Sequence, residues 1–462
     1  MGEFVACPSS PLTSGLPATD SHRRQKSSVG RPGIGPGTAP NSSRCLPDQE
    51  IAAEPSPVVH LSGNANAGVG TGPVARLPRM RVAIVAESFL PQVNGVTNSV
   101  LRVLEHLRAT GHDAFVIAPN DPGRTPRQYL GYPVVTLPSV GLPGYSDVRV
   151  VGTTTFAMAK ILDDHGPDVV HLAAPFMMGY KGALATAHLG LPSVAIYQTE
   201  VATYAARYGV PHLEQVFWRR LRLAHSLATL NFAPSTFSRE QLVQQGIPRV
   251  GIWARGVDSV RFHPDKRSAA LRRQWAPNGE KIVGYMGRLA PEKKVEDLRA
   301  VADLPGTRLV VIGGGPLLDQ LRTSLPNAIF TGPKSGDDLA IALASFDVFV
   351  HTGELETFGQ TIQEAQASGV PVIAPRRGGP VDLVIPSHTG WLYEPGDLDG
   401  LRGYVADLVG DDAKRAAFAE TCRETVKNRT WSALCEQLVG HYRHAIHAAA
   451  QSAEPQPLIT AL

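Results

Sequence analysis

The sequence predicts an α/β protein with two doubly wound parallel sheets that face each other across a cleft. Short apolar runs, typical of strands buried on both faces, alternate with helical segments. This alternation occurs twice, over about 170 residues each time. The length of 462 residues also suits two or three domains of roughly 150 residues. Since such sheets bind ligands at the carboxyl ends of their strands, we expect functional residues in the loops that follow strands.

The first series of elements begins at Met80, where MRVAIVAESF opens a strand, and defines an N-terminal domain over 80–252. Its predicted strands are Val82–Ala86, Ala114–Ala118, Val169–Leu172, Ser193–Tyr197 and Leu230–Ala233. The predicted helices lie around 96–109, 153–164, 180–189, 213–229 and 236–245.

The second series defines a C-terminal domain over 253–430, which starts with a charged linker region after Trp253–Asp258. The predicted strands are Ile282–Met286, Arg308–Ile312, Ala328–Phe330, Val348–His351 and Val372–Ala374. A helix is then predicted over Trp431–Ala448, because Leu434, Leu438, Tyr442 and Ile446 recur at four-residue spacing.

Residues 1–79 differ in composition from the rest of the chain. They hold 11 Pro, 10 Gly and 10 Ser, and Phe4 is their only aromatic residue. Such a segment buries too little apolar surface to offset the entropy lost on ordering, so we expect it to be disordered. We expect Met80 to be the native start, with a regulatory tail as the alternative. A loose tail is expected over 451–462.

Charge and composition exclude several function classes. The 44 Lys and Arg nearly balance the 41 Asp and Glu, so nothing in the net charge of +3 favours a nucleic-acid partner. The four cysteines form no Cys-x-x-Cys pair, which argues against a disulfide scaffold or a zinc site. No apolar run reaches 18 residues and the start lacks a signal pattern, so we expect a cytoplasmic protein.

The loop after the first strand contains Asn94-Gly95 and leads into a helix at Val96. This pair lets the backbone turn tightly and directs amide groups toward a ligand at the helix N-terminus, which is a natural phosphate site. The alternative is an ordinary turn between strand and helix. No Gly-x-Gly-x-x-Gly occurs in this loop, which weakens a dinucleotide-dehydrogenase interpretation.

Two cations follow the first strand of the second domain. Arg288 and Lys293 lie five residues apart, before a helix that we expect near Val295. The helix dipole disfavours cations at that end unless an anion binds between them. A diphosphate fits, because Arg offers a fork of donors and Lys a movable charge. A solvated loop is the alternative interpretation.

Two carboxylates, Glu356 and Glu364, follow the strand at 348–351 with seven residues between them. Thr357 and Gln360 have capping-box spacing, which predicts that a helix starts at Thr357, and the helix dipole alone could explain Glu356. Glu364 lies about 120° from the apolar stripe, on its flank. Carboxylates placed there can face a cleft and accept hydrogen bonds from hydroxyl groups.

Together these motifs resemble the retaining glycosyltransferases of family 4, which have the GT-B fold. The resemblance covers about residues 80–450. It rests on the Arg288/Lys293 and Glu356/Glu364 motifs, on Val169–Leu172, Ala233–Ser235, Arg255–Asp258 and Ile312–Pro316, and on their order. Arg81–Gly95 and Ile196–Glu200 are similar to mycobacterial-type α-mannosyltransferases that use GDP-mannose to build glycolipids.

The resemblance implies a role for each candidate residue. Arg288 and Lys293 would neutralise the leaving diphosphate, Glu356 would bind hydroxyl groups of the transferred sugar, and Glu364 would bind the ribose. The remaining positions would contact the phosphates or the sugar, and they are Asn94, Gly95, and the backbone of Phe358 and Gly359. By the same resemblance, the helix over 431–450 would cross back onto the first domain, with Arg443 and His447 on its exposed side.

One position departs from the family pattern. Many members carry a His where this chain has Gln198, and that His binds the sugar ring in its reactive geometry. Gln198 can position the sugar through hydrogen bonds, but its side chain does not titrate, which argues against proton transfer at this position. No divalent metal or other cofactor is expected, because Arg288 and Lys293 can neutralise the diphosphate and no Asp-x-Asp follows a strand.

The acceptor is implied to be a lipid. Helix 213–229 is predicted to bury Leu213, Val216, Phe217, Leu221, Ala224 and Ala228 and to carry Arg219 and Arg222 on the opposite face. A basic amphipathic helix can lie on an anionic bilayer, although a packed helix with a solvated basic face is the simpler interpretation. The implied acceptors are glucuronosyl-diacylglycerol or phosphatidylinositol mannosides.

Three other functions stay open from sequence alone. A non-hydrolysing sugar-nucleotide epimerase shares the two-domain fold and could use a cleft carboxylate as acid or base. A transferase could also use a UDP-sugar in place of GDP-mannose. A pure binding module needs fewer charged motifs at strand ends than this chain has.

Overall fold

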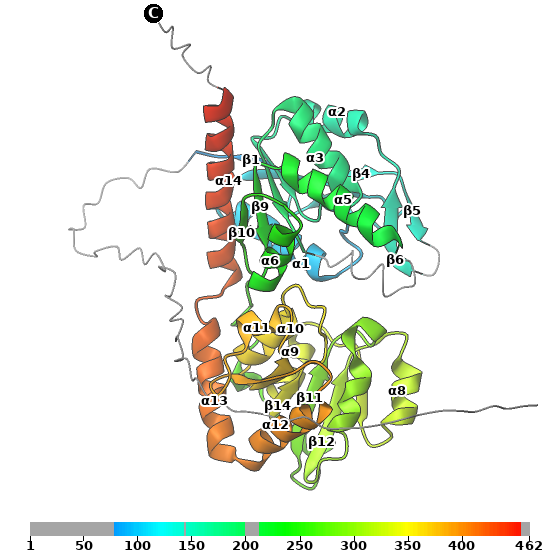
Figure 1. The fold of residues 1–462 in the computed structure, drawn as a ribbon, viewed down its shortest axis with the longest axis vertical. Coiled ribbons are helices and arrows are strands. Elements are labelled where there is room, and N and C mark those ends of the chain that lie inside the picture. Colours follow the sequence, from blue (N-terminus) through cyan, green and yellow to red (C-terminus); the bar gives the residue numbers. More distant parts are fainter. Residues whose placement is uncertain (1–77, 143–144, 199–211, 454–462) are drawn as a thin grey trace, which may run out of the picture. The chain divides into compact units, whose positions relative to one another are not determined.

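A computed structural model describes residues 78–142, 145–198 and 212–453, and Figure 1 shows their fold. Two large sheets with helices on both faces confirm the predicted α/β class. Both sheets belong to one compact unit over residues 75–462. The predicted extension over 1–79 lies outside the described residues up to position 77, and so do residues 454–462 of the predicted tail.

The first sheet has eight strands in the order β10-β9-β8-β7-β1-β2-β4-β3, all parallel except the pairing of β3 with β4. Its strands are β1 (Arg81–Val85), β2 (Asp113–Pro119), β3 (Gln128–Tyr129), β4 (Tyr132–Leu137), β7 (Val169–Leu172), β8 (Ser193–Ile196), β9 (Leu230–Ala233) and β10 (Val250–Ile252). A separate antiparallel hairpin joins β5 (Ser139–Leu142) to β6 (Tyr145–Val151).

Both faces of this sheet are buried because successive side chains of each strand point to opposite sides. In β1, Val82 and Ile84 pack into one core cluster, while Ala83 and Val85 pack into the other. The first cluster is covered by helix α1 (Gly95–Ala109) and by α14 (Trp431–Ala453). The second is covered by α2 (Thr155–His165), α3 (Met178–Leu189) and α5 (His212–Leu227). Helix α6 (Thr236–Gln244) precedes β10.

The second sheet has six parallel strands in the order β13-β12-β11-β14-β15-β16. They are β11 (Lys281–Met286), β12 (Thr307–Ile312), β13 (Ile329–Gly332), β14 (Val348–Val350), β15 (Val372–Pro375) and β16 (Gly390–Tyr393). The α-helices of this part are α7 (Ala269–Trp275), α8 (Leu318–Ser324), α9 (Gly336–Ala344), α10 (Gln360–Ala367), α11 (Pro380–Leu383), α12 (Leu398–Gly410) and α13 (Asp412–Val426). Short 3₁₀ helices cover Pro264–Lys266, Pro291–Lys293 and Val295–Ala300.

Helix α14 packs on the first sheet although it follows the last element of the second (Figure 1). Its residues Leu438 and Tyr442 are fully buried in the core cluster that contains Val82. The Tyr442 hydroxyl lies 2.5 Å from Nδ1 of His171 in β7, and burial lowers the pKa of this His to about 3. The C-terminal segment therefore contributes to the first core.

Some local predictions hold only in part. His447 is exposed on α14 as predicted, whereas Arg443 is only partly exposed and lies 3.8 Å from Glu436. In α5, Val216 was expected in the apolar face but is 44% exposed, and Trp218 is buried in its place. Leu221, Ala224 and Ala228 are buried as predicted, so the buried face differs from the prediction mainly at its first turns.

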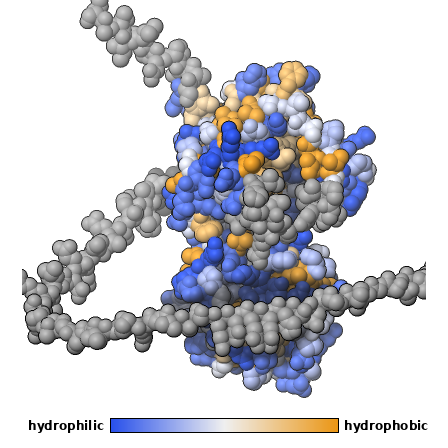
Figure 2. All heavy atoms as spheres, turned by 45° about the vertical axis from the view of Figure 1, so that its right-hand side comes forward, coloured by the Kyte–Doolittle hydropathy of each residue, from blue (hydrophilic) through white to orange (hydrophobic). Residues whose placement is uncertain are grey.

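The region predicted as a linker also contains structure. Helix α7 lies within it, and Trp275 of that helix is buried against Phe346. The strands between 128 and 151 were not predicted, because they are short and mix polar with apolar residues. Among the described residues, no helix is both long and apolar enough to cross a bilayer. Apolar residues lie scattered among hydrophilic ones on the face that Figure 2 shows.

The buried position of Leu438 makes α14 testable. We expect Leu438→Ala to lower the free energy of unfolding by about 2–5 kcal/mol, because the cavity opens inside the first core. The control is Gln437→Ala, whose side chain is exposed on the same helix and should change stability by less than about 0.5 kcal/mol. Urea denaturation measures both. Equal small effects of the two variants would show that α14 does not stabilise the first domain.

Candidate active site

The candidate residues follow strands of the two sheets, where parallel strands expose their carboxyl ends. Gly95 follows β1 through a loop, and Gln198 lies two residues after β8. Arg288 and Lys293 follow β11, and Glu356 follows β14. The topology therefore delivers these side chains to the edge where α/β proteins of this kind bind ligands.

The loop after β1 ends in a well-formed helix cap. The Asn94 side chain accepts hydrogen bonds from the backbone N–H groups of Val96 and Thr97, both at 3.0 Å, and donates to Ser88. Gly95 does not take the left-handed conformation, so the predicted tight turn is not the reason for glycine here. A Cβ atom at Gly95 would lie only 2.6 Å from Nη1 of Arg255, so glycine leaves room for the guanidinium group.

Gln198 lies next to the same guanidinium group. Its Nε2 donates to the carbonyl of Ala173 at 2.7 Å, and its Oε1 accepts from Nη2 of Arg255 at 3.2 Å. These two bonds determine the orientation of the amide. Gln198 is 5% exposed, and its backbone carbonyl accepts a hydrogen bond from Thr357. Thr357 therefore joins the loop of Glu356 to the end of β8.

The loop that carries Arg288 and Lys293 packs against a glycine-rich turn. The N–H of Leu289 donates to the carbonyl of Gly314 at 2.9 Å. Gly313 and Gly315 have positive φ angles, and a Cβ atom on either would lie within 2.4 Å of a carbonyl oxygen of the 287–289 backbone. Only glycine permits this approach of the two backbones.

Lys293 and Glu356 form an ion pair at the centre of the site. Burial raises the pKa of Glu356, but the charge and hydrogen bond of Lys293, together with His351 and Arg255, outweigh burial and hold this pKa below its usual value. The carboxylate is therefore ionised at neutral pH. His351 lies 3.6 Å from the same carboxylate, and burial lowers its pKa to about 4, so its imidazole is neutral. Gly353 lies among these three side chains.

The other cation of the loop, Arg288, is more loosely held. Its side chain is 55% exposed and lies 3.9 Å from Glu292. The expected helix near Val295 is a 3₁₀ helix that begins only after Lys294. Each of the two cations therefore has a carboxylate neighbour within the protein, Glu292 for Arg288 and Glu356 for Lys293.

Lys294 separates the two short helices and has φ +48° and ψ +40°. This left-handed conformation is unfavourable for a residue with a Cβ atom. Its ammonium group lies 2.8 Å from Glu354, and Arg377 lies 3.8 Å from the same carboxylate. In addition, Thr352 donates to the Lys293 carbonyl at 2.6 Å. The 293–294 backbone is therefore tied to the loop that carries Glu356.

Helix α10 starts later than predicted. It begins at Gln360 with Gly359 at the N-cap, and Thr357 bonds to the end of β8 instead of capping the helix. Gly359 has φ +98°, which favours glycine. The Phe358 side chain is 2% exposed and belongs to the core of the second domain. Its backbone is packed against Gly379, where a Cβ atom would lie 2.2 Å from the Phe358 carbonyl oxygen.

Glu364 lies in α10, in a different environment from Glu356. Burial raises its pKa to about 7, and the hydrogen bond from Gln360 and the charge of Arg261 offset only part of this rise. Asp258 adds a repulsive charge. Glu364 therefore titrates near neutral pH, whereas Glu356 does not.

The structure brings together four of the predicted residues through contacts of Arg255 and Thr357. They are Gly95, Gln198, Lys293 and Glu356.

Sequence reasoning missed three of the surrounding residues, which are Arg255, His351 and Glu354. Arg255 belongs to the family motif Arg255–Asp258, but no pattern of apolar residues indicated where its side chain lies. The position of His351 directly after β14 is the signal that could have identified it.

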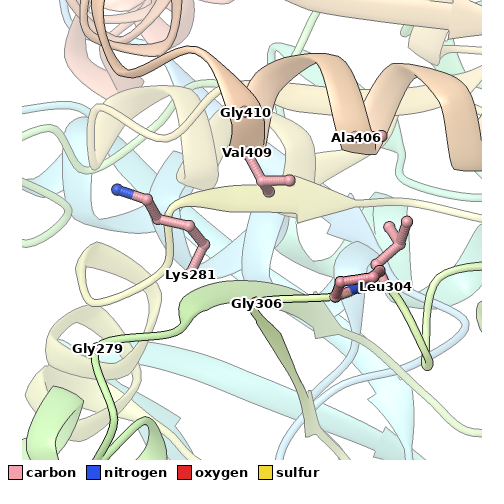
Figure 3. A pocket seen from close by; sticks show the side chains of 8 residues that line it. Gly279, Lys281, Leu304, Gly306, Ala406, Val409 and Gly410 are labelled. Carbon is pink, nitrogen blue, oxygen red and sulfur yellow. The ribbon is translucent and has the colours of Figure 1, made fainter.

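A cavity of about 360 Å³ lies elsewhere in the second domain. It is bounded by the start of β11 at Lys281, the turn before β12 at Gly306, and Val409 of α12 (Figure 3). These are the amino ends of the strands, opposite to the edge that carries the candidate residues. Within the described residues, no group of three or more His, Cys, Asp or Glu side chains is arranged to hold a metal ion.

Comparisons with known proteins identify the family of this chain. Residues 93–261 match Glycosyltransferase Family 4, and residues 268–425 match Glycosyl transferases group 1. A GDP-mannose-dependent alpha-mannosyltransferase of Mycobacterium tuberculosis is 50% identical over 367 residues, which cover 79% of this chain and 96% of the relative. A protein of the same name from Corynebacterium glutamicum is 47% identical over 370 residues, with 79% and 89% covered. A sulfoquinovosyl transferase of Arabidopsis thaliana is 33% identical over 370 residues, with 77% and 72% covered.

Solved structures show the same fold at low identity. Sucrose-phosphate synthase from Thermosynechococcus elongatus has a TM-score of 0.69 at 21% identity, over 80% of this chain and all of that chain. Anabaena HepE in complex with UDP and glucose has a TM-score of 0.64 at 21% identity, over 79% of this chain and all of that chain. The fold and the matched families define a glycosyltransferase of the GT-B type. The chain belongs to glycosyltransferase family 4.

The backbone at Lys294 provides a test of how the loop is held. Lys294→Gly and Lys294→Ala both remove the ion pair with Glu354, but only glycine tolerates φ +48° without strain. We therefore expect the alanine variant to have a free energy of unfolding about 1 kcal/mol lower than the glycine variant. Urea denaturation of the two proteins checks this difference. An alanine variant as stable as the glycine variant would show that the loop relaxes to another conformation.

Proposed function

We propose that this enzyme transfers mannose from GDP-mannose to a lipid-linked acceptor, with retention of the α configuration. The observation that carries this proposal is the Lys293–Glu356 ion pair, which places an ammonium group beside an ionised carboxylate at the ligand-binding edge. The 50% identical mycobacterial and 47% identical corynebacterial relatives support mannose and guanine as the sugar and base.

The cations of the β11 loop match the leaving group of this reaction. Cleavage of the bond between the anomeric carbon and the diphosphate leaves negative charge on the diphosphate and an oxocarbenium-like sugar. In the proposal, Lys293 and Arg288 bind that diphosphate, and Arg288 is exposed enough to turn from Glu292 toward it. The acceptor oxygen attacks on the face that the diphosphate leaves, and the departing phosphate oxygen takes the acceptor proton.

The sugar is bound, in this proposal, from two sides. Glu356 accepts hydrogen bonds from sugar hydroxyl groups, and its negative charge stabilises the positive charge that grows on the ring. Gln198 positions the ring, because its amide orientation is determined by Ala173 and Arg255. Its neutral amide moves no proton, which agrees with proton transfer to the phosphate.

The remaining candidate residues surround the nucleotide. Glu364 accepts hydrogen bonds from the ribose hydroxyl groups, and its distinct environment suits a binding role apart from the reacting atoms. The backbone N–H groups of Phe358 and Gly359 lie at the start of α10, where a phosphate or a sugar oxygen is favoured. Asn94 and Gly95 supply the corresponding helix end of the first domain.

The acceptor side is proposed to contact a membrane through the helix at 213–229. In the described part of α5, the side chains of Arg219, Arg220 and Arg222 are exposed. Val216 and Leu223 are 44% and 42% exposed, so apolar side chains lie between these basic ones. Such a surface is attracted to anionic headgroups and can bury its apolar side chains in the interface. This arrangement supports acceptors such as glucuronosyl-diacylglycerol or phosphatidylinositol mannosides.

The proposed function is tested by incubating the enzyme with radiolabelled GDP-mannose and a panel of glycolipids in mixed micelles. We expect labelled α-mannosyl lipid with at least one acceptor and little product with UDP-glucose, because the relatives named for GDP-mannose share half of the sequence. Glu356→Gln is the matched control and should lose product formation by orders of magnitude. Release of a new sugar nucleotide without any acceptor would instead establish an epimerase.

The two glutamates should differ in their pH dependence. If Glu364 binds the ribose in its ionised form, GDP affinity should rise by about fivefold to tenfold between pH 6 and 8, as Glu364 loses its proton near pH 7. Glu364→Gln should bind GDP more weakly at pH 8 and lose this rise, whereas Glu356→Gln should keep both the affinity and the rise. Calorimetry at several pH values measures the GDP dissociation constant of each variant. Protonation of GDP itself affects all variants equally, so it does not contribute to the difference between them. An unchanged pH profile in Glu364→Gln would contradict the assignment.

A further inference from the structure

The backbone around Arg255 is fixed by contacts with helices α10 and α14. Trp253 donates from Nε1 to the Leu434 carbonyl at 2.8 Å, and Gln363 donates to the Arg255 carbonyl at 2.9 Å. A Cβ atom at Gly256 would lie 2.5 Å from the Trp431 backbone, so the segment is pressed against the start of α14. The Arg255 side chain therefore leaves a rigid segment, and its direction is set by the fold.

The guanidinium group of Arg255 is buried against the N-terminus of α1. Arg255 is only 7% exposed, and its Nη1 lies 2.6 Å from the position of a Cβ at Gly95. Nη2 donates to Gln198, while the buried Nε has no hydrogen-bond partner among the described residues. The hydrogen bond of Nη2 therefore orients the guanidinium group, and its Nε–H group can still donate a hydrogen bond.

This position is unfavourable for a cation in the absence of a ligand. The N-terminus of α1 carries partial positive charge, and its first turn contains no acidic residue. In the part of the chain that the structure describes, no carboxylate lies within 4.0 Å of Arg255. Burial lowers the pKa of Arg255 to about 10, and the more distant Glu356 offsets this only in part. A bound anion would compensate both the buried charge and the helix end.

We propose that Arg255 binds the diphosphate of the donor, as a third cation beside Arg288 and Lys293. This inference rests on the proposed function, because the diphosphate is the leaving group of that reaction. Gly95 makes the site possible by leaving space for the guanidinium, and Gln198 orients it. Glutamine suits this position because a neutral amide can accept from Arg255, whereas a protonated imidazole would repel it.

The test compares the binding of GDP with that of guanosine by calorimetry in the full-length protein. Arg255→Gln should weaken GDP by about 10–100-fold, the range expected for a lost charged hydrogen bond, and should leave guanosine within about twofold. Arg249→Gln is the matched control. It removes one arginine at the opposite end of β10, where the side chain bonds only to backbone carbonyls. This control should change neither affinity.

A second variant moves the guanidinium without removing its charge. Gly95→Ala places a methyl group where Nη1 now lies, so it should also weaken GDP more than guanosine. Equal weakening of both ligands in Arg255→Gln would show that Arg255 only supports the fold and would overturn the inference. Unchanged GDP binding with weakened GDP-mannose binding would overturn it as well, because the contact would then be to the sugar. If the unmodified protein binds no GDP, the proposed function itself fails.

Discussion

The ion pair between Lys293 and Glu356 is the interaction on which the candidate site depends. It joins the loop after β11 to the loop after β14, two strands that are neighbours in the second sheet. Two further contacts reinforce the junction, from Thr352 to the Lys293 carbonyl and from Lys294 to Glu354. Because both loops start from buried parallel strands, little freedom remains at their ends. The protein's own contacts therefore hold these charges in place, which is the condition for electrostatic stabilisation of a transition state.

The ion pairs also affect how strongly the cations of the β11 loop can bind an anionic ligand. Lys293 attracts Glu356 and Arg288 lies near Glu292, so each cation has an internal partner in the structure. In the proposed function, the diphosphate competes with these carboxylates for the two cations. Arg255 differs because it has no carboxylate neighbour within ion-pair distance among the described residues, and it is already desolvated. A cation that has lost its water before binding contributes more to an anion contact than an exposed one does.

The sequence predicted the parts of the fold that depend on local pattern. The strands Val169–Leu172 and Leu230–Ala233 have the predicted bounds, because a continuous apolar run between polar turns identifies a buried strand. Strands β3 to β6 were missed, since their residues alternate irregularly and pair with neighbours only through the tertiary fold. The start of α10 was misplaced for a related reason. The hydroxyl of Thr357 could cap a helix, but the end of β8 supplies a competing acceptor that lies 159 residues away in the chain.

The candidate site shows the same limit. Motif spacing identified Lys293 and Glu356, because each follows a strand whose end could be located. It could not identify Arg255, whose importance comes from three contacts with distant parts of the chain, at Gly95, Gln198 and Gln363. Gly95 illustrates why such a residue escapes sequence reasoning. The glycine was explained by a turn that the backbone does not make, and its physical reason is the volume of another residue's side chain. The chemistry of this edge therefore depends on packing between segments as much as on the motifs themselves.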